Sequence, residues 1–353
     1  MEGTSPSLEP TVDPYNITVV GGAGIVGREF LKILDEREAP VGRLRLLATS
    51  RSAGKQVAFR GKTITIEEAT DASFTADDQI VFLSASGAAS KRYAPIAQAN
   101  GSFVIDDSSA YRMDPTVPLV IPEINPEDLE WHTGIVSQPN CTTTPMVMAL
   151  NPIHRVNPLR RIIVSTYQAV AGAGGAAVDG LASETRAALE GRHEPSGTQK
   201  REIAFNAVPQ IDLFDADDYT KEEIKMANET RKLLHAPDIA ISATCVRVPV
   251  SFGHSMTIWA EFERPISASE ARALMAAAPG VTVVDDPSRE EYPTPMDVAG
   301  TDAVLVGRIR KDTSSHEGGI TFWALTDSIR KGAASNVVDV IAEAARRGLI
   351  RRR

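Results

Sequence analysis

The residue best suited to covalent chemistry is Cys141, which directly follows the segment Ser137–Asn140. The short run 134–136 before this segment is apolar, and residues 146–150 after it are apolar and compatible with a helix. Because proline and asparagine favour a turn, Cys141 is predicted to lie where a strand turns into a helix. The free N–H groups and the positive dipole end of a helix N-terminus both favour a thiolate. The same N–H groups could hold an oxyanion that develops beside the sulfur.

The alternative for any cysteine is a buried structural thiol, and Cys245 fits that description better. It lies in the β-rich run 239–246, which contains no turn. After Cys141, by contrast, Thr142 to Thr144 are predicted to cap the following helix, and Pro145 suits its first turn. Cys141 is therefore predicted to be the nucleophile.

Several charged side chains could recognise an anionic substrate. Arg247 stands in an otherwise apolar strand and needs a partner, either an acid of the protein or a ligand carboxylate. Arg112 follows a predicted strand end, where an anion site and a solvated loop charge are equally good interpretations. Glu222 and Lys225 are three residues apart on a helix that Thr220 is predicted to cap, and this spacing favours an exposed ion pair.

A base is harder to choose from the six histidines. His254 follows a glycine at the start of a predicted strand, which places it near a surface or a cleft. On the sequence alone it is no better a base than His235 or His316.

The elements that would position a cofactor begin with the apolar strand 16–20, which runs into the loop Gly21–Gly27 and then a helix. Glycines at positions 21, 24 and 27 suit a turn where the backbone approaches a pyrophosphate. The next strand ends at residues 49–55, which offer Arg51 beside Ser52 instead of the acid typical of an NAD site. This favours a 2′-phosphate, and hence NADP.

Strands and helical stretches alternate up to residue 140, which is typical of a parallel, doubly wound α/β sheet of the Rossmann type. The second half reads as strands with helices on one side, an α+β catalytic and dimerisation domain. The predicted domains are a disordered extension over residues 1–14, a nucleotide-binding domain over 15–140, and the α+β domain over 141–330. The final helix, within 331–353, completes the nucleotide-binding domain.

Length and composition support an ordinary two-domain globular protein of 353 residues. The net charge of −9 argues against nucleic acid or an anionic membrane as the main partner. Two cysteines far apart give no disulfide framework, so a reducing compartment and a cytoplasmic location are expected. We find no apolar segment suited to a signal peptide or a membrane span, and no clustering of metal ligands.

Several stretches together, in a fixed order, resemble the aspartate-β-semialdehyde dehydrogenase family. The match extends from about Tyr15 to the final helix. The stretches that carry it are Gly21–Gly27, Arg51–Lys55, Ser108–Arg112, Gln138–Thr142, Thr166–Val170, Ala207–Asp212, Glu222–Lys225, Arg247–Val250, Gly253–Ser255 and Arg330–Asn336.

The resemblance implies NADPH-dependent reductive dephosphorylation of L-aspartyl-4-phosphate to L-aspartate-4-semialdehyde and phosphate, in lysine, methionine and threonine biosynthesis. It implies a thioester on Cys141, with His254 as acid and base, and a homodimer or a dimer of dimers. The ordinary pKa of histidine, near neutrality, suits His254 to both directions of proton transfer. The other implied catalytic residues are Gln168 and Asn140. The implied substrate ligands are Arg247 for the α-carboxylate, Glu222 for the α-amino group, and Arg112 and Lys225 for the phosphate. The implied cofactor ligands are Gly21, Gly22, Ala23, Gly24, Ile25, Val26, Gly27, Arg51, Ser52, Ser86, Gly172 and Asn336.

The chain departs from the family pattern at a few positions. Gly22-Ala23 stand where the family usually has Ala-Thr, Ser86 where a second glycine is common, and Ala171 where serine is common. These changes affect details of the cofactor geometry.

Other functions remain open. One is a related acyl-phosphate or aldehyde reductase, such as an N-acetyl-glutamyl-phosphate reductase or a phosphorylating glyceraldehyde-type enzyme. The others are a catalytically silent NADP-binding paralogue and a simple NADP sensor. Glu222 with Arg247 argues against an acetylated substrate, because an acetylated amino group needs no carboxylate partner.

Overall fold

The structure is a computed structural model that describes residues 14–193, 195 and 201–351. The predicted disordered extension, residues 1–14, lies outside the described residues except for its last residue. The chain divides into two compact units, each with a six-stranded sheet of its own. The first unit holds the residues up to Asn140 and those from Ala333 on, and the second is Cys141–Gly332.

The first unit is built on a sheet with the strand order β5-β2-β1-β6-β7-β8, in which all neighbours are parallel. Its strands are β1 (Tyr15–Val20), β2 (Val41–Ala48), β5 (Glu67–Glu68), β6 (Ile80–Leu83), β7 (Phe103–Asp106) and β8 (Ile135–Ser137). Its helices are α1 (Ile25–Glu36), α2 (Gly87–Ala99) and α8 (Ser335–Arg346). The hairpin β3 (Gln56–Phe59) and β4 (Lys62–Thr65) and the short 3₁₀ helices η1 (Asp71–Ser73) and η2 (Pro126–Trp131) complete it.

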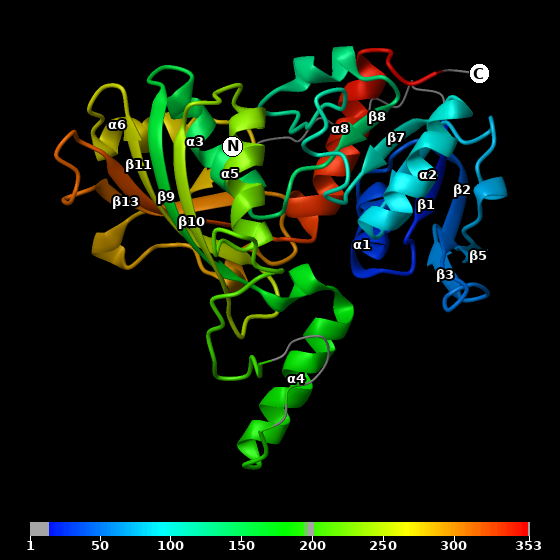
Figure 1. The fold of residues 1–353 in the computed structure, drawn as a ribbon, viewed down its shortest axis with the longest axis horizontal. Coiled ribbons are helices and arrows are strands. Elements are labelled where there is room, and N and C mark those ends of the chain that lie inside the picture. Colours follow the sequence, from blue (N-terminus) through cyan, green and yellow to red (C-terminus); the bar gives the residue numbers. More distant parts are fainter. Residues whose placement is uncertain (1–13, 194, 196–200, 352–353) are drawn as a thin grey trace. The chain divides into compact units, whose positions relative to one another are not determined.

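Both faces of this sheet are covered, which confirms the predicted doubly wound arrangement. Val19 points into a core shared with α1 and α8, whereas its neighbour Val20 points into a core shared with α2. Consecutive strand residues face opposite sides of a sheet, so the two cores lie on opposite faces. The last helix, α8, therefore belongs to the first unit (Figure 1).

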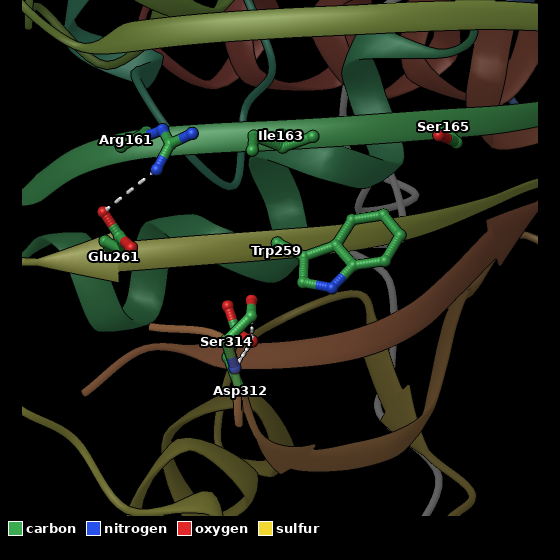
Figure 2. A pocket seen from close by; sticks show the side chains of 7 residues that line it. All are labelled: Arg161, Ile163, Ser165, Trp259, Glu261, Asp312 and Ser314. Carbon is green, nitrogen blue, oxygen red and sulfur yellow. Dashed lines mark hydrogen bonds and ion pairs between the residues drawn. The ribbon is translucent and has the colours of Figure 1, made fainter. Parts of the chain in front are cut away.

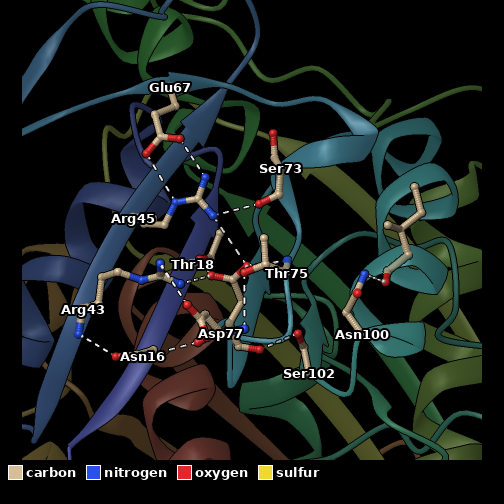
Figure 3. Close-up of polar contacts among 12 residues, drawn as sticks. Asn16, Thr18, Arg43, Arg45, Glu67, Ser73, Thr75, Asp77, Asn100 and Ser102 are labelled. Atoms are coloured by element: carbon tan, nitrogen blue, oxygen red, sulfur yellow. Dashed lines mark hydrogen bonds and ion pairs between the residues drawn. The ribbon is translucent and has the colours of Figure 1, made fainter.

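A buried acid ties the strands together at the end of the sheet opposite the β1–α1 loop. Asp78, just before β6, is 1% exposed. One of its oxygens accepts hydrogen bonds from Thr18 Oγ1 at 2.8 Å and from Arg43 Nη2 at 2.9 Å. The other accepts from the Thr75 N–H at 2.8 Å and lies 3.5 Å from Arg45 Nη1. Figure 3 shows the two arginines side by side on β2.

The second unit contains a mixed sheet with the order β10-β9-β11-β14-β13-β12. Its strands are β9 (Leu159–Gln168), β10 (Ala240–Arg247), β11 (His254–Phe262), β12 (Val281–Val283), β13 (Val304–Lys311) and β14 (Ile320–Thr326). Its helices are α3 (Thr143–His154), α4 (Gly175–Leu189), α5 (Lys221–Leu233), α6 (Ala268–Ala276) and α7 (Pro295–Val298). Short turns are η3 (Val170–Ala173), η4 (Pro287–Arg289) and η5 (Arg330–Ala334), the last of which runs across the boundary between the units.

Among the described residues, the longer helices that pack on this sheet cover one of its faces, as the sequence predicted, whereas the short α7 packs beside Leu305 and Leu325 on the other face. On β11, Met256, Ile258 and Ala260 are fully buried, whereas the alternating Thr257 and Trp259 stay partly exposed. The helices α3, α5 and α6 pack on the buried side, and α4 extends away from the sheet (Figure 1). In the part of the chain that the structure describes, no helix combines the length and apolar character needed to cross a membrane.

Candidate active site

Three predicted site residues meet where the strands β9, β10 and β11 of the second sheet end or begin. Gln168 ends β9, and Arg247 ends β10 directly beside it in the parallel register. The antiparallel β11 pairs Ser255 with Tyr167, which brings its first residue, His254, next to Gln168. Residues in register on adjacent strands share a face, so the three side chains gather at the same end of the sheet. All three are buried.

Cys141 lies between the end of β8 and the start of α3, at the corner where the sequence predicted it. It is partly exposed, whereas Cys245 is fully buried in β10, and neither of the two forms a disulfide bond. Burial raises the pKa of the Cys245 thiol, which suits its predicted structural role. Thr142 occupies the N-cap position of α3 with helical backbone angles, and its side chain does not make the predicted capping bond.

Thr142 instead donates a hydrogen bond to Glu222 Oε1 at 3.2 Å. The same oxygen accepts from Gln168 Nε2 at 3.1 Å, and Oε2 accepts from Lys225 Nζ at 3.4 Å. Glu222 is 5% exposed, so the interpretation as an exposed ion pair is wrong. One carboxylate thus connects the residue after the predicted nucleophile with two other predicted site residues.

The helix that carries Glu222 starts as the sequence predicted. Thr220 accepts from the Glu223 N–H, and the Glu223 side chain accepts from the Thr220 N–H, so the two residues form a capping box. This fixes Glu222 in the first turn of α5. Lys225, one turn later, also pairs with Asp212 at 2.9 Å.

The backbone of Ala169 holds both His254 and Arg247. Its carbonyl oxygen accepts from Arg247 Nη1 at 2.6 Å, and its N–H donates to His254 Nδ1 at 3.1 Å. Because Nδ1 accepts a hydrogen bond, the neutral imidazole carries its proton on Nε2. Among the described residues, His254 Nε2 and Arg247 Nε have no hydrogen-bond partner, although both atoms are buried.

Burial also sets the electrostatics of this pair. It lowers the pKa of His254 from its usual value to about 3; Arg247 lowers it further, and Glu222 partly offsets the effect. The pKa near neutrality assumed from the sequence is therefore wrong for this structure, and of the two predicted positions, at a surface or in a cleft, burial excludes the surface. Burial also lowers the pKa of Arg247, with Glu222 opposing.

In the first unit, the glycine loop between β1 and α1 has the tight geometry that the sequence predicted. Gly21 has φ +90°, and a Cβ there would overlap the Ser84 carbonyl oxygen. A Cβ on Gly27 would stand 2.5 Å from the Gly21 oxygen. The N-cap Gly24 makes no side-chain capping bond and the first turn of α1 has no acid, so its N–H groups suit an anion.

The remaining cofactor candidates of the first unit flank the carboxyl ends of its strands. Arg51 and Ser52 lie in the turn after β2, where the Arg51 side chain is exposed. Ser86 caps α2 by accepting from the Ala89 N–H, so its hydroxyl has a structural task. Asn336 on α8 is buried and donates to the Val120 carbonyl oxygen and to Gln138 Oε1.

Arg112 also belongs to the first unit, and it is 7% exposed. This burial excludes the solvated loop charge. Its Nη2 donates to the Asp107 carbonyl oxygen at 2.8 Å. Burial raises the pKa of the Asp107 carboxyl to about 7; Arg112 lowers it and Asp106 raises it. The sequence had singled out the arginine and missed this acid.

Two further candidates are close in sequence to residues already described: Asn140 precedes Cys141, and Gly172 follows the end of β9. Asn140 is 7% exposed. Gly172, in η3, lies directly against the His254 ring. In the described part of the chain, no three histidine, cysteine, aspartate or glutamate side chains gather closely enough to hold a metal ion.

Known proteins match both units. A family model described as "Semialdehyde dehydrogenase, NAD binding domain" matches residues 16–132, and one described as "Semialdehyde dehydrogenase, dimerisation domain" matches residues 150–331. The aspartate-semialdehyde dehydrogenase of Aquifex aeolicus is 48% identical over 339 residues, which cover 95% of this chain and 99% of that protein. The chain belongs to the aspartate-semialdehyde dehydrogenase family. The Bacillus subtilis member is 46% identical over 92% of this chain and 96% of its own length.

The family assignment extends to solved structures. Aspartate semialdehyde dehydrogenase II from Vibrio cholerae superposes with a TM-score of 0.91 at 41% identity, covering 95% of this chain and 99% of the other. Its complex with ASA matches with a TM-score of 0.90 at 40% identity. These likenesses confirm the predicted fold class and the resemblance seen in the sequence.

Proposed function

We propose that this member of the aspartate-semialdehyde dehydrogenase family reduces L-aspartyl-4-phosphate to L-aspartate-4-semialdehyde and phosphate. The observation that carries the proposal is the shared carboxylate of Glu222, which links the helix after Cys141 with Gln168 and Lys225. Such a site offers a thiol for the acyl carbon and an acid for an amino group. Arg247, buried beside them, supplies the cation for the α-carboxylate.

The chemistry follows from these residues. The Cys141 sulfur attacks the acyl carbon, the C=O electron pair moves to oxygen, and its return expels phosphate and leaves a thioester. His254 presents Nε2–H, a neutral hydrogen-bond donor suited to the oxygen where charge develops. Gln168, held by Glu222 and by Thr166 Oγ1, orients the substrate. Arg112 and Lys225 are proposed to bind the phosphate.

The first unit fits NADP. The Gly21 turn permits close approach of a ligand to the backbone, the uncapped N-terminus of α1 suits the pyrophosphate, and the exposed Arg51 suits the 2′-phosphate. When bound, NADPH supplies the hydride that reduces the acyl group. We assign the loop Gly21–Gly27 with Ser52, Ser86, Gly172 and Asn336 to the cofactor as well, and Asn140 to the catalytic set.

The decisive experiment is phosphate-dependent NADP reduction by purified protein with L-aspartate-4-semialdehyde, compared with N-acetyl-glutamate semialdehyde and glyceraldehyde 3-phosphate. We expect strong preference for the first substrate, because Glu222 pairs with a free amino group. Cys141→Ala should abolish turnover while NADP binding stays intact. A Cys245→Ala variant is the matched control and should keep its activity. Turnover by Cys141→Ala would reject the thioester route.

The open face of the second sheet supports a dimer. It carries a hollow of about 470 Å³ lined by Trp259, Ile163 and the Arg161–Glu261 pair (Figure 2). Tyr167, 40% exposed, contacts the Trp323 ring on the same face. A second copy of the chain is proposed to cover this face, in a homodimer or a dimer of dimers. Trp259→Glu should then reduce the molar mass measured by light scattering to that of a monomer; an unchanged mass would place the interface elsewhere.

The cytoplasmic location predicted from the sequence is also part of this proposal. Its support is that neither Cys141 nor Cys245 forms a disulfide bond, which suits a reducing compartment. We place the reaction there, in the biosynthesis of lysine, methionine and threonine.

A further inference from the structure

The two side chains proposed to react each lie against a glycine. We propose that Gly332 and Gly172 are positioning residues: Gly332 sets the place of the Cys141 thiol, and Gly172 sets the place of the His254 imidazole. Each does so by lacking a Cβ where one would displace the reacting group. The inference rests on the proposed function, because it takes Cys141 and His254 as the reacting groups.

Gly332 forms the surface against which Cys141 rests. A Cβ at position 332 would lie 2.9 Å from the Cys141 Cβ and 3.3 Å from its Cα. Real Cβ atoms essentially never approach a carbon at the shorter distance, and the atom they would meet is too close to the backbone to swing away. An alanine here therefore moves the cysteine itself, together with its sulfur.

The turn that carries Gly332 is held firmly. It belongs to η5, a π-helical turn, and such turns are frequent at functional sites. The Gly332 N–H donates to the Asp327 carbonyl oxygen at 3.1 Å. Asp327 Oδ1 accepts from the Ile329 N–H at 2.8 Å, and Arg330 pairs with Asp302 at 2.8 Å. The turn thus cannot retreat easily from Cys141.

Gly172 has the same relation to His254. A Cβ at position 172 would lie 2.8 Å from Nε2 and 3.0 Å from Cε1 of the ring, and 3.5 Å from Arg247 Nη1. Nε2 is the buried nitrogen that has no partner among the described residues. The missing Cβ leaves room in front of the atom proposed to contact the substrate oxygen.

The loop around Gly172 is also anchored. The Val170 N–H donates to the Val250 carbonyl oxygen at 2.9 Å, and the Ala171 N–H donates to that of Ser251 at 3.1 Å. Val170 is buried in a small core with Leu181 on α4. The imidazole, held at Nδ1 by Ala169, would have to yield to a methyl group at position 172.

An alanine at position 172 or 332 tests the contact of its added Cβ with the neighbouring side chain, and it adds no backbone strain. Neither Gly172 nor Gly332 has the positive φ that disfavours other residues. Gly175 offers a matched control, because it also lacks a positive φ and a Cβ there would meet nothing within 4 Å.

The experiment compares Gly332→Ala, Gly172→Ala and Gly175→Ala in the full-length protein. For each variant we would measure kcat, KM, NADP binding and the rate at which iodoacetamide labels Cys141. Both site variants should lose about 100-fold in kcat, since a displacement of about 1 Å costs that much. Gly332→Ala should also change the labelling rate of Cys141 by about tenfold or more, whereas Gly172→Ala should leave it near wild type and raise KM through Arg247. Gly175→Ala should match the wild type throughout.

A double-mutant cycle keeps the test valid if Gly332→Ala folds poorly. Because the predicted collision is with the Cys141 Cβ, Cys141→Gly should remove most of the stability lost by Gly332→Ala, measured by thermal unfolding. If the stability losses of the two substitutions were additive, the proposed collision between position 332 and the Cys141 Cβ would be rejected. Wild-type kcat in either site variant would overturn the positioning role, while inactivity of the wild type and of Gly175→Ala toward the aspartyl substrate would defeat the proposed function instead.

Discussion

Each unit of the molecule buries a cluster of charged and polar side chains, and the two clusters differ in how completely they are satisfied. In the first unit, both oxygens of Asp78 have partners, supplied by Thr18, Thr75, Arg43 and Arg45. In the second unit, the cluster of Glu222, Arg247 and His254 keeps two buried nitrogens without partners among the described residues. A buried polar atom without a partner costs roughly 1–3 kcal/mol.

The difference in hydrogen bonding distinguishes a structural cluster from one that suits a substrate. The Asp78 cluster connects β1, β2 and the start of β6, at the end of the strands away from the glycine loop. Both oxygens of Asp78 have partners within the protein. The second cluster lies where β9, β10 and β11 meet, and its open hydrogen-bonding positions suit a substrate. We therefore interpret the first cluster as structural and the second as catalytic, which makes opposite predictions for substitutions in the two.

The largest effect is expected for Arg247→Leu. Loss of the proposed carboxylate partner should lower kcat/KM for the aspartyl substrate by roughly 10³-fold, since truncating one member of a buried charge pair costs about 2–5 kcal/mol. Stability should change little, because the substitution also removes a buried cation with an unpaired nitrogen. Steady-state kinetics with thermal unfolding measures both. A strongly destabilised but fully active variant would reverse our interpretation of this cluster.

Asp78→Asn should show the reverse pattern. Removing this charge leaves two arginines facing a neutral amide in a buried site, so the free energy of unfolding should fall by about 3 kcal/mol. Denaturant titration measures the loss, and kcat should stay at the wild-type value. Asp77→Asn is the control, because Asp77 is largely exposed and lies 3.9 Å from Arg43. A fall in kcat without a loss of stability would mean that the first cluster has a role in the reaction.

The sequence was sufficient for most elements and for the corner at which Cys141 lies, because those signals are local. Proline and asparagine before Cys141 predict the corner, and the glycines at 21, 24 and 27 predict the β1–α1 loop. Spacing alone failed on Glu222, whose distance from Lys225 along the helix is typical of an exposed pair, because its burial is decided by α5 packing on β10. The sequence also could not find Gly332 as the neighbour of Cys141, since residues 191 positions apart meet only in the fold.

The pH dependence of stability provides the finest test of the comparison. The folded-state pKa of His254 is about 3, against 6.5 for the exposed side chain, so between these values the unfolded chain binds a proton that the folded protein does not. Stability should therefore fall as the pH drops below 6.5, with His254 contributing up to about 3 kcal/mol of loss by pH 4. Denaturant titrations at several pH values should show a shallower loss for His254→Gln, while His316→Gln at an exposed position follows the wild type. Equal slopes for all three proteins would mean that the imidazole is not held neutral by burial beside Arg247, and the catalytic cluster would then differ less from that of Asp78.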